Sequence, residues 1–192
     1  MVGSDDLARE IAKPTDQRDV HTYVHKESGA DGPRILSIIR PAKYPERLRP
    51  FLNALSAARV GIIEVQRIDA TLGEALVAFA SSGLTKGMAI INAPEGEWVD
   101  EEQARMLFKQ AGLADWTFAQ GDGIELRTVL YDFMDDIADE LRANAEAPLV
   151  IPVDQYFNVK GIGLVAIGYV QSGTVHVHDE LILLPANGTG NA

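Results

Sequence analysis

The residues of this chain that could carry chemistry are few, and they do not form a complete catalytic or metal-binding set. His176 and His178 stand two apart on an expected strand, so both rings would lie on one face, as a metal site requires. No third ligand accompanies them, which favours two solvent-facing strand residues. His21 and His25 stand four apart on another expected strand, a spacing that does not bring their rings together. No nucleophile with an adjacent base can be identified, so nothing in the sequence argues for catalysis.

Charged side chains gather at two places. A run of acids at helical spacing is predicted to form the solvated face of a helix rather than a cation site; its members are Asp132, Asp135, Asp136, Asp139 and Glu140. The second group follows Pro41 closely and consists of Lys43, Arg47 and Arg49. These cations are the candidate partner-binding residues because they could meet RNA phosphate or an acidic partner. A solvated helix face is the alternative.

The composition narrows the classes of function. The chain has 192 residues, a formal net charge of -11 and no cysteine. The negative charge argues against a dedicated DNA-binding protein and against a polybasic membrane binder. The lack of cysteine excludes a disulfide framework and a thiolate zinc site. The charged N-terminus lacks the apolar core of a signal peptide, and no apolar run reaches the length of a membrane span, so we expect a soluble cytoplasmic protein.

Strands alternate with helices through the first three quarters of the chain. Helices are expected over 5–13, 44–59, 71–83, 100–112 and 124–145, and strands over 20–26, 34–41, 60–65, 87–92 and 115–120, with a turn over 27–33. This alternation predicts an α/β domain over residues 1–147, with a mostly parallel sheet and flanking helices.

The pattern changes after Glu146–Pro148. Only short β runs separated by glycines follow, over 150–159, 163–170 and 174–184, and a polar tail ends the chain. Residues 148–192 are therefore predicted to form a second, all-β domain. The alternation further predicts that the second and third runs pair as antiparallel strands through a turn at Gly173.

This β segment carries a specific spacing of residues. From Pro152 to Asp179 it follows the pattern P-x-x-x-x-F-x-x-x-G-x-G-x-V-x-x-G-x-V-x-x-G-x-x-x-x-x-D, which places in register Pro152, Phe157, Gly161, Gly163, Val165, Gly168, Val170, Gly173 and Asp179. The pattern resembles the start of the domain 2 β-barrel of elongation factor Tu and its relatives. The resemblance implies that the domain ahead of it is similar to the P-loop GTPase domain of that family.

The phosphate-binding and magnesium-binding motifs of that family are not found intact. A P-loop needs glycines, a lysine and a Ser or Thr in the pattern G-x-x-x-x-G-K-[ST], which occurs nowhere in the chain. Aligned from Gly3, its last three positions fall on Ala8, Arg9 and Glu10. The family's D-x-P-G-H motif keeps only its proline, because its positions hold Ile39, Pro41, Ala42 and Lys43.

The guanine-reading motifs are also altered. N-K-x-D becomes Asn92-Ala93-Pro94-Glu95, so only the asparagine remains, and S-A-x-x-G becomes residues 117–121 with Phe118 at a small-residue position. The combined losses are similar to those of archaeal translation-factor-like proteins, relatives of elongation factor Tu and of the selenocysteine-specific elongation factor. For this chain they imply a degenerate GTPase-like α/β domain followed by a partial translation-factor barrel.

The resemblance leads to a function hypothesis with two alternatives. We expect a nucleotide-independent binding or regulatory module in translation, without a cofactor, whose partner is the ribosome, a tRNA or another factor. The first alternative is a GTP-binding elongation factor that delivers aminoacyl-tRNA, including selenocysteinyl-tRNA; the second is a purely structural subunit. The β segment is about half the length of a full barrel, so either the chain is a fragment or a second copy or a partner completes its open edges.

Overall fold

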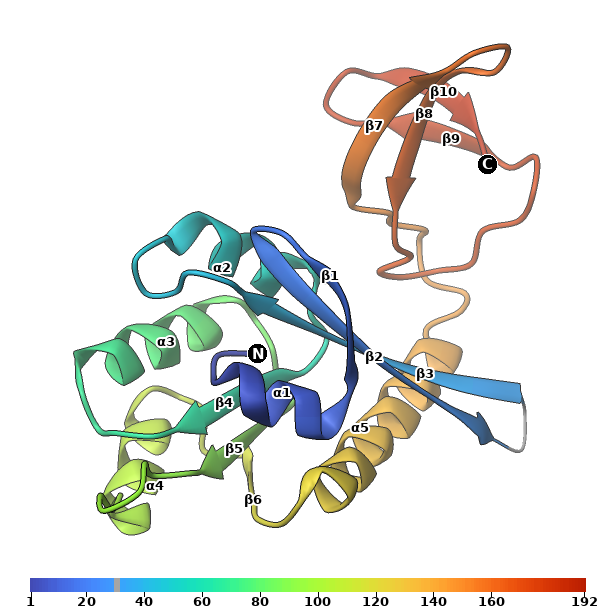
Figure 1. Ribbon diagram of the computed structural model, residues 1–192. Helices are drawn as coiled ribbons and strands as arrows, with labels where there is room; N and C mark the ends of the chain where they lie inside the picture. Colours follow the sequence, from blue (N-terminus) through green and yellow to red (C-terminus); the bar gives the residue numbers. More distant parts are fainter. Residues whose placement is uncertain (30–31) are drawn as a thin grey trace. The chain divides into compact units, whose positions relative to one another are not determined.

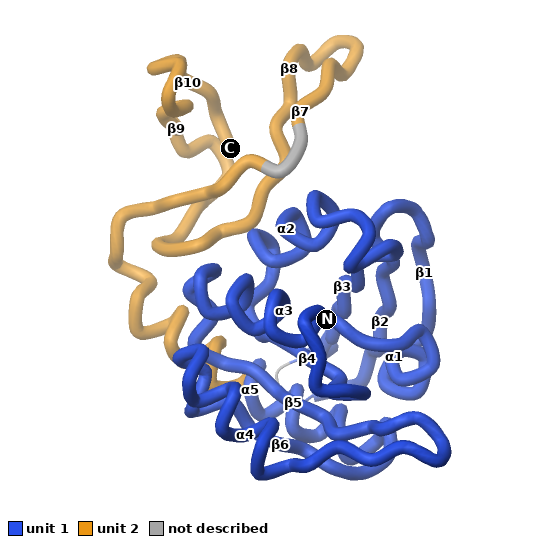
Figure 2. Tube along the Cα trace, turned by 90° about the vertical axis from the view of Figure 1, so that its left-hand side faces the viewer, with its two compact units in different colours: residues 1–134 blue, residues 135–192 orange. Residues whose placement is uncertain are grey.

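The computed structural model describes residues 1–29 and 32–192, without the side chains of residues 154 and 155. Residues 30 and 31, in the turn expected over 27–33, lie outside the described residues. The chain forms two compact units, Met1–Met134 (unit 1) and Asp135–Ala192 (unit 2), coloured separately in Figure 2. Helix α5 runs through the boundary between them. The domain boundary expected at 147/148 stays a prediction.

Unit 1 contains a mixed set of strands (Figure 1). Three pair antiparallel in the order β1-β2-β3 and three pair parallel in the order β4-β5-β6. Their bounds are β1 Lys13–Gln17, β2 Val20–Gly29, β3 Gly32–Pro41, β4 Gly61–Val65, β5 Gly87–Ile91 and β6 Thr117–Ala119. The expectation of a mostly parallel sheet is therefore wrong. No helix separates β1, β2 and β3, and strands joined without a long crossover pair antiparallel.

The first three residues of the chain connect the two sets of strands. Val2 pairs in parallel with Ile63 of β4, donating its N–H to the Ile62 carbonyl at 2.8 Å. On the other side the Met1 amino group donates to the Ile39 carbonyl of β3 at 2.7 Å. Residues 1–3 therefore lie between β3 and β4 in the place of a central strand.

The described part of the chain has five helices, and all but α2 are capped at the N-terminus by side chains. Ser4 accepts from the Leu7 N–H, Asp69 from Leu72 and Asp100 from Gln103. At the fifth helix, Asp122 and Glu125 each accept the other's backbone N–H, a reciprocal capping box. The helices are α1 Asp5–Ile11, α2 Leu48–Ala57, α3 Ala70–Ser81, α4 Glu101–Gln110 and α5 Gly123–Ala143. None of the described helices has the length and apolar character of a membrane span.

Two apolar clusters hold unit 1 together, one on each face of the strands. Successive residues of β5 alternate between them: Met88 joins the first cluster and Ala89 the second. Helices α1 and α5 supply the first, and α2, α3 and α4 supply the second. Trp116 lies against the paired glycines Gly61 and Gly87, where an added Cβ would come within 2.2 Å of the indole. Glycine is therefore required at both positions for the indole to pack on β4 and β5.

Unit 2 consists of two separate hairpins. Strand β7 (Val153–Val159) pairs with β8 (Gly163–Gly168), and β9 (Glu180–Leu183) pairs with β10 (Gly188–Asn191). The expected pairing of the second and third runs through Gly173 is wrong. The reversal lies instead at Gly161 and Gly163, whose φ values of 88° and 104° suit a tight turn. The polar tail supplies β10.

Unit 2 has little interior. No described residue of this unit is buried, and many large apolar side chains are exposed, among them Tyr156, Phe157, Ile162, Leu164, Ile167, Val177, Ile182 and Leu184. Gly168 lies close to the neighbouring backbone, since an added Cβ would lie 2.3 Å from the Pro152 carbonyl oxygen. The hairpins therefore depend on local contacts rather than on an apolar core.

Candidate functional site

The candidate site is the turn between the first residues of the chain and helix α1. Val2 pairs with β4 and α1 begins at Asp5, so only Gly3 and Ser4 connect strand and helix. This turn lies at the carboxyl end of the parallel strands, the edge at which open α/β sheets bind ligands. A phosphate cradle of the P-loop type needs a longer, glycine-rich loop at this place.

The Glu64 carboxylate occupies this turn. Glu64 belongs to β4 and is 6% exposed. Its carboxylate accepts hydrogen bonds from the Ser4 N–H, from Ser4 Oγ at 3.1 Å and from Asn92 Nδ2 at 2.6 Å. Backbone N–H groups at such a turn are the donors that hold a phosphate in nucleotide-binding proteins. Here a carboxylate of the chain itself receives the Ser4 N–H.

Gly3 is needed for this arrangement. An added Cβ at Gly3 would lie 2.8 Å from Cβ of Glu64 and 2.9 Å from its Oε2. A larger residue would therefore displace the carboxylate from the turn. Arg40 supports the turn from β3, since its Nε donates to the Gly3 carbonyl at 2.7 Å.

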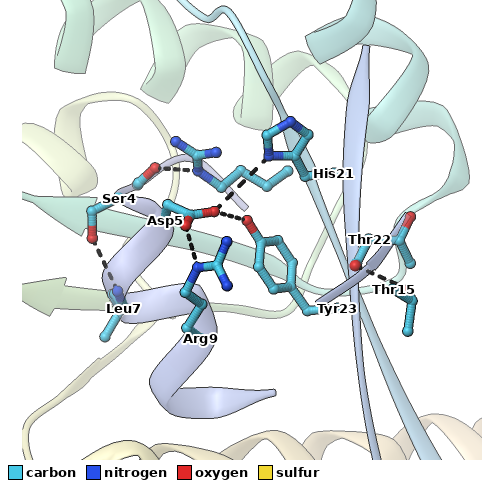
Figure 3. A network of polar contacts seen from close by, with 10 residues as sticks. Ser4, Asp5, Leu7, Arg9, Thr15, His21, Thr22 and Tyr23 are labelled. Carbon is cyan, nitrogen blue, oxygen red and sulfur yellow. Dashed lines mark hydrogen bonds and ion pairs between the residues drawn. The ribbon is translucent and has the colours of Figure 1, made fainter. Parts of the chain in front are cut away.

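A second polar network fixes the first turn of α1 to strand β2 (Figure 3). Tyr23 Oη and Arg9 Nε both donate to the Asp5 carboxylate, and His21 Nδ1 lies 3.9 Å from it. These hydrogen bonds, first that of Tyr23 and then that of Arg9, lower the pKa of Asp5. Burial and the Asp5 contact raise the pKa of Tyr23. Asp5 is therefore held ionised as an anchor, with its acceptors engaged by residues of the chain.

A cavity of about 370 Å³ opens beside Glu64. Its wall includes Arg40, Tyr44, Arg67 and Asp69. Most of these groups are engaged by neighbours: Tyr44 Oη donates to the Thr71 carbonyl at 3.2 Å, and Asp69 caps α3. Arg67 contacts Glu97 through two hydrogen bonds of 2.7 and 2.5 Å, and this pairing lowers the pKa of Glu97. The cavity volume is near the lower end of the range of small-molecule sites, and the charges of its wall are largely paired.

The residues aligned with the end of the P-loop do not lie in a loop. Ala8, Arg9 and Glu10 are in the middle and last turn of α1. Ala8 is buried in the core, Arg9 contacts Asp5, and the Glu10 carbonyl accepts from Arg127 at 2.9 Å. The structure therefore brings none of the three to the strand–helix turn.

The residues aligned with the second and third motifs have mixed positions. Pro41 is buried at the end of β3 and Ile39 binds Met1 through its carbonyl, while Lys43 is exposed in the following turn. The Ala42 N–H donates to the Asp19 carbonyl at 3.0 Å. Asn92 joins the candidate site through its bond to Glu64, whereas Glu95 is exposed.

The two histidine pairs lie in different settings. His176 and His178 lie in the exposed turn before β9 rather than on a strand, so that expectation is wrong; the His176 N–H donates to the Asp179 carboxylate at 2.7 Å. His21 and His25 lie on β2, and His25 Nδ1 is 2.8 Å from Tyr131 Oη. Within the described part of the chain, no three His, Asp or Glu side chains are grouped to hold a metal ion.

Sequence reasoning missed the central residue of the site. Glu64 interrupts an apolar strand, GIIEV, and a single carboxylate in a buried strand is an informative signal. Its partners Ser4 and Asn92 lie 60 and 28 residues away in sequence, so only the fold brings them together.

No protein-family model matches the chain. Several individual proteins are similar to it in sequence. An uncharacterised protein of Methanocaldococcus jannaschii is 26% identical over 181 residues, 94% of this chain and 54% of the relative. The elongation factor 1-alpha of Thermococcus onnurineus is 22% identical over 178 residues, and the selenocysteine-specific elongation factor of M. jannaschii is 35% identical over 68 residues. The chain is therefore similar in sequence to archaeal translation elongation factors.

Solved structures of these factors share the fold of the chain. A bacterial selenocysteine-specific elongation factor has a TM-score of 0.60 at 20% identity, covering 91% of this chain and 31% of that protein. The elongation factor SelB of Methanococcus maripaludis, in complex with the GTP analogue GppNHp, has a TM-score of 0.55 at 18% identity. The chain spans about half the length of the M. jannaschii protein and 41% of elongation factor 1-alpha.

Proposed function

We propose that this elongation-factor relative is a nucleotide-independent binding or regulatory module of translation. Its kinship with elongation factors supports the role in translation. Nucleotide independence rests on one observation: the Glu64 carboxylate accepts the Ser4 N–H at the strand–helix turn. In this proposal an internal anion stands where a nucleotide phosphate would have to bind.

Electrostatics opposes a phosphate at this turn. Two unit charges about 4 Å apart repel by about 4 kcal/mol at the effective dielectric constant of a protein surface. That energy corresponds to about a thousandfold in affinity. Ser4 Oγ donates to Glu64 and accepts from Leu7, so the hydroxyl is also engaged.

Guanine recognition is opposed by the same contacts. The Asn92 amide donates to Glu64 at 2.6 Å, so the surviving residue of the guanine-reading motif already has a partner within the chain. Glu95, at the position of the guanine-binding aspartate, is exposed and follows Pro94. Together these contacts oppose nucleotide binding. In this proposal the domain uses the fold that it shares with its relatives to bind a macromolecule.

Co-sedimentation with ribosomes tests the proposal. Ribosomes purified from M. jannaschii, the source of one relative, are mixed with the chain in the absence of nucleotide, with GDP and with GTP, each with Mg²⁺. We expect the same bound fraction in all three conditions. Binding that requires GTP and is lost with GDP would support the GTPase alternative instead.

A further inference from the structure

A basic and apolar surface covers the start of helix α2. It consists of Lys43, Arg47, Leu48, Arg49 and Leu52, called here the α2 patch. All five residues are exposed, and the two leucines retain 45% and 48% of their accessible surface. The patch lies wholly within unit 1. Its cations, Lys43, Arg47 and Arg49, are the candidate partner-binding residues of the sequence analysis.

The charges of the α2 patch are available to a partner. Three cations outnumber the single carboxylate of Glu46 in the same segment, in a chain whose net charge is -11. Among the described residues, Lys43 and Arg49 have no ion-pair partner. Arg47 Nη1 lies 3.7 Å from Asp19, with both side chains largely exposed. An exposed ion pair of this kind contributes little, so Arg47 can exchange Asp19 for another carboxylate.

The leucines of the patch are not needed by the fold. Phe51, Ala54 and Leu55 form the buried face of α2. Leu48 and Leu52 stand one turn apart on its exposed face, where a helix that only covers a sheet carries polar residues. An apolar pair at i,i+4 spacing with arginines beside it is the composition of a protein-binding surface.

We infer that the α2 patch binds an acidic amphipathic helix of a protein partner. This inference rests on the proposed function, because it names the kind of partner that the module binds. Leu48 and Leu52 meet the apolar stripe of the partner helix, and the three cations meet carboxylates along its edges. RNA fits less well, because none of the five residues is aromatic and two leucines would face phosphates or ribose without stacking a base.

Fluorescence anisotropy with defined probes tests the inference. The first probe is a labelled synthetic helix with leucines along one face and glutamates beside them. Two control peptides replace its glutamates by lysine or its leucines by serine, and labelled poly-U is the RNA probe. The whole chain is titrated without nucleotide. We expect weak binding of the first probe, with a Kd on the order of 100 μM for a surface of this size. The control peptides and poly-U should not bind.

Variants then assign the binding to the patch. Arg49→Glu and Leu52→Ser are each expected to weaken binding by at least about fivefold, the effect of an interfacial charge or leucine at an exposed site. Their matched controls are Lys109→Glu on α4 and Val77→Ser on α3, exposed residues outside the patch. Both controls should bind as the parent does, and added salt should weaken binding because the cations are exposed.

The outcomes separate the inference from the proposed function. Poly-U binding that Arg49→Glu removes and Leu52→Ser leaves intact would overturn the inference in favour of RNA. So would the absence of peptide binding, or peptide binding that neither patch variant alters. GTP affinity is measured separately. Patch-dependent peptide binding by a chain that also binds GTP would sustain the α2 patch and refute nucleotide independence.

Discussion

Replacing Glu64 tests the contact that defines the candidate site. Glu64→Ala removes the acceptor of the Ser4 N–H, of Ser4 Oγ and of the Asn92 amide. Hydrogen bonds to a charged group contribute about 1.5–3 kcal/mol each. Water can reach Ser4 and Asn92, which are partly or fully exposed, and removing a buried carboxylate relieves its desolvation. We therefore expect a net loss of about 2–3 kcal/mol in the free energy of unfolding.

The loss is measurable by thermal and urea unfolding. For a chain of this length each kcal/mol lowers the melting temperature by about 3 °C, so Glu64→Ala should melt about 6–9 °C lower. Glu64→Gln keeps one acceptor oxygen and should lose about 1 kcal/mol. The control Glu95→Ala removes an exposed carboxylate from the neighbouring loop and should stay within about 0.5 kcal/mol of the parent.

A double-mutant cycle gives the coupling directly. Glu64→Ala and Asn92→Ala should lose less stability together than the sum of the single losses, with a coupling of about 1 kcal/mol. If Glu64→Ala had the same melting temperature as the parent and the Glu95→Ala control, the Glu64 carboxylate would not be bound at the turn. The electrostatic reasoning about phosphate would then lose its basis.

Three further predictions concern packing and association. Gly168→Val places atoms against the Pro152 carbonyl, 2.3 Å from the ideal Cβ, and should increase amide hydrogen exchange in β7; unchanged protection would contradict the close approach. Gly87→Val clashes with Trp116 and should unfold unit 1 or red-shift its tryptophan fluorescence. Its control, Gly73→Ala, lies in open space on α3 and should stabilise the folded chain by about 0.5–1 kcal/mol. The exposed apolar side chains of unit 2 should cause self-association at micromolar concentration, since each 100 Å² of apolar surface removed from water contributes about 2.5 kcal/mol. A monomer in sedimentation equilibrium would refute that expectation.

Local sequence patterns predicted the helices and the parallel strands of unit 1 well. Apolar periodicity and capping residues such as Asp69 and Asp100 mark α3 and α4 close to their observed bounds. Strand β1, KPTDQ, was missed because it is polar and its proline indicated a helix end. It pairs only at an edge, where a proline is tolerated. Strand β1 adds a third antiparallel strand beside the β2–β3 pair, so the strands are less parallel than the sequence pattern indicated.

The strand pairing of unit 2 and the candidate site required the fold. Alternating apolar residues in 163–168 and 174–184 permit more than one register, and the turn at Gly161 decides between them. The motif alignment named Asn92, which contacts Glu64, and it placed the end of the P-loop on residues that lie inside α1. It could not reveal Glu64, because the role of that residue depends on a turn 60 residues away.

Isothermal titration calorimetry with GTP and with GDP tests the central claim most directly. The chain is titrated with each nucleotide in the presence of Mg²⁺, and Glu64→Ala is titrated alongside it. Because the Glu64 carboxylate opposes phosphate at the strand–helix turn, the account predicts no saturable heat for the parent chain with either nucleotide. Micromolar binding of GTP or GDP by the parent chain would contradict it.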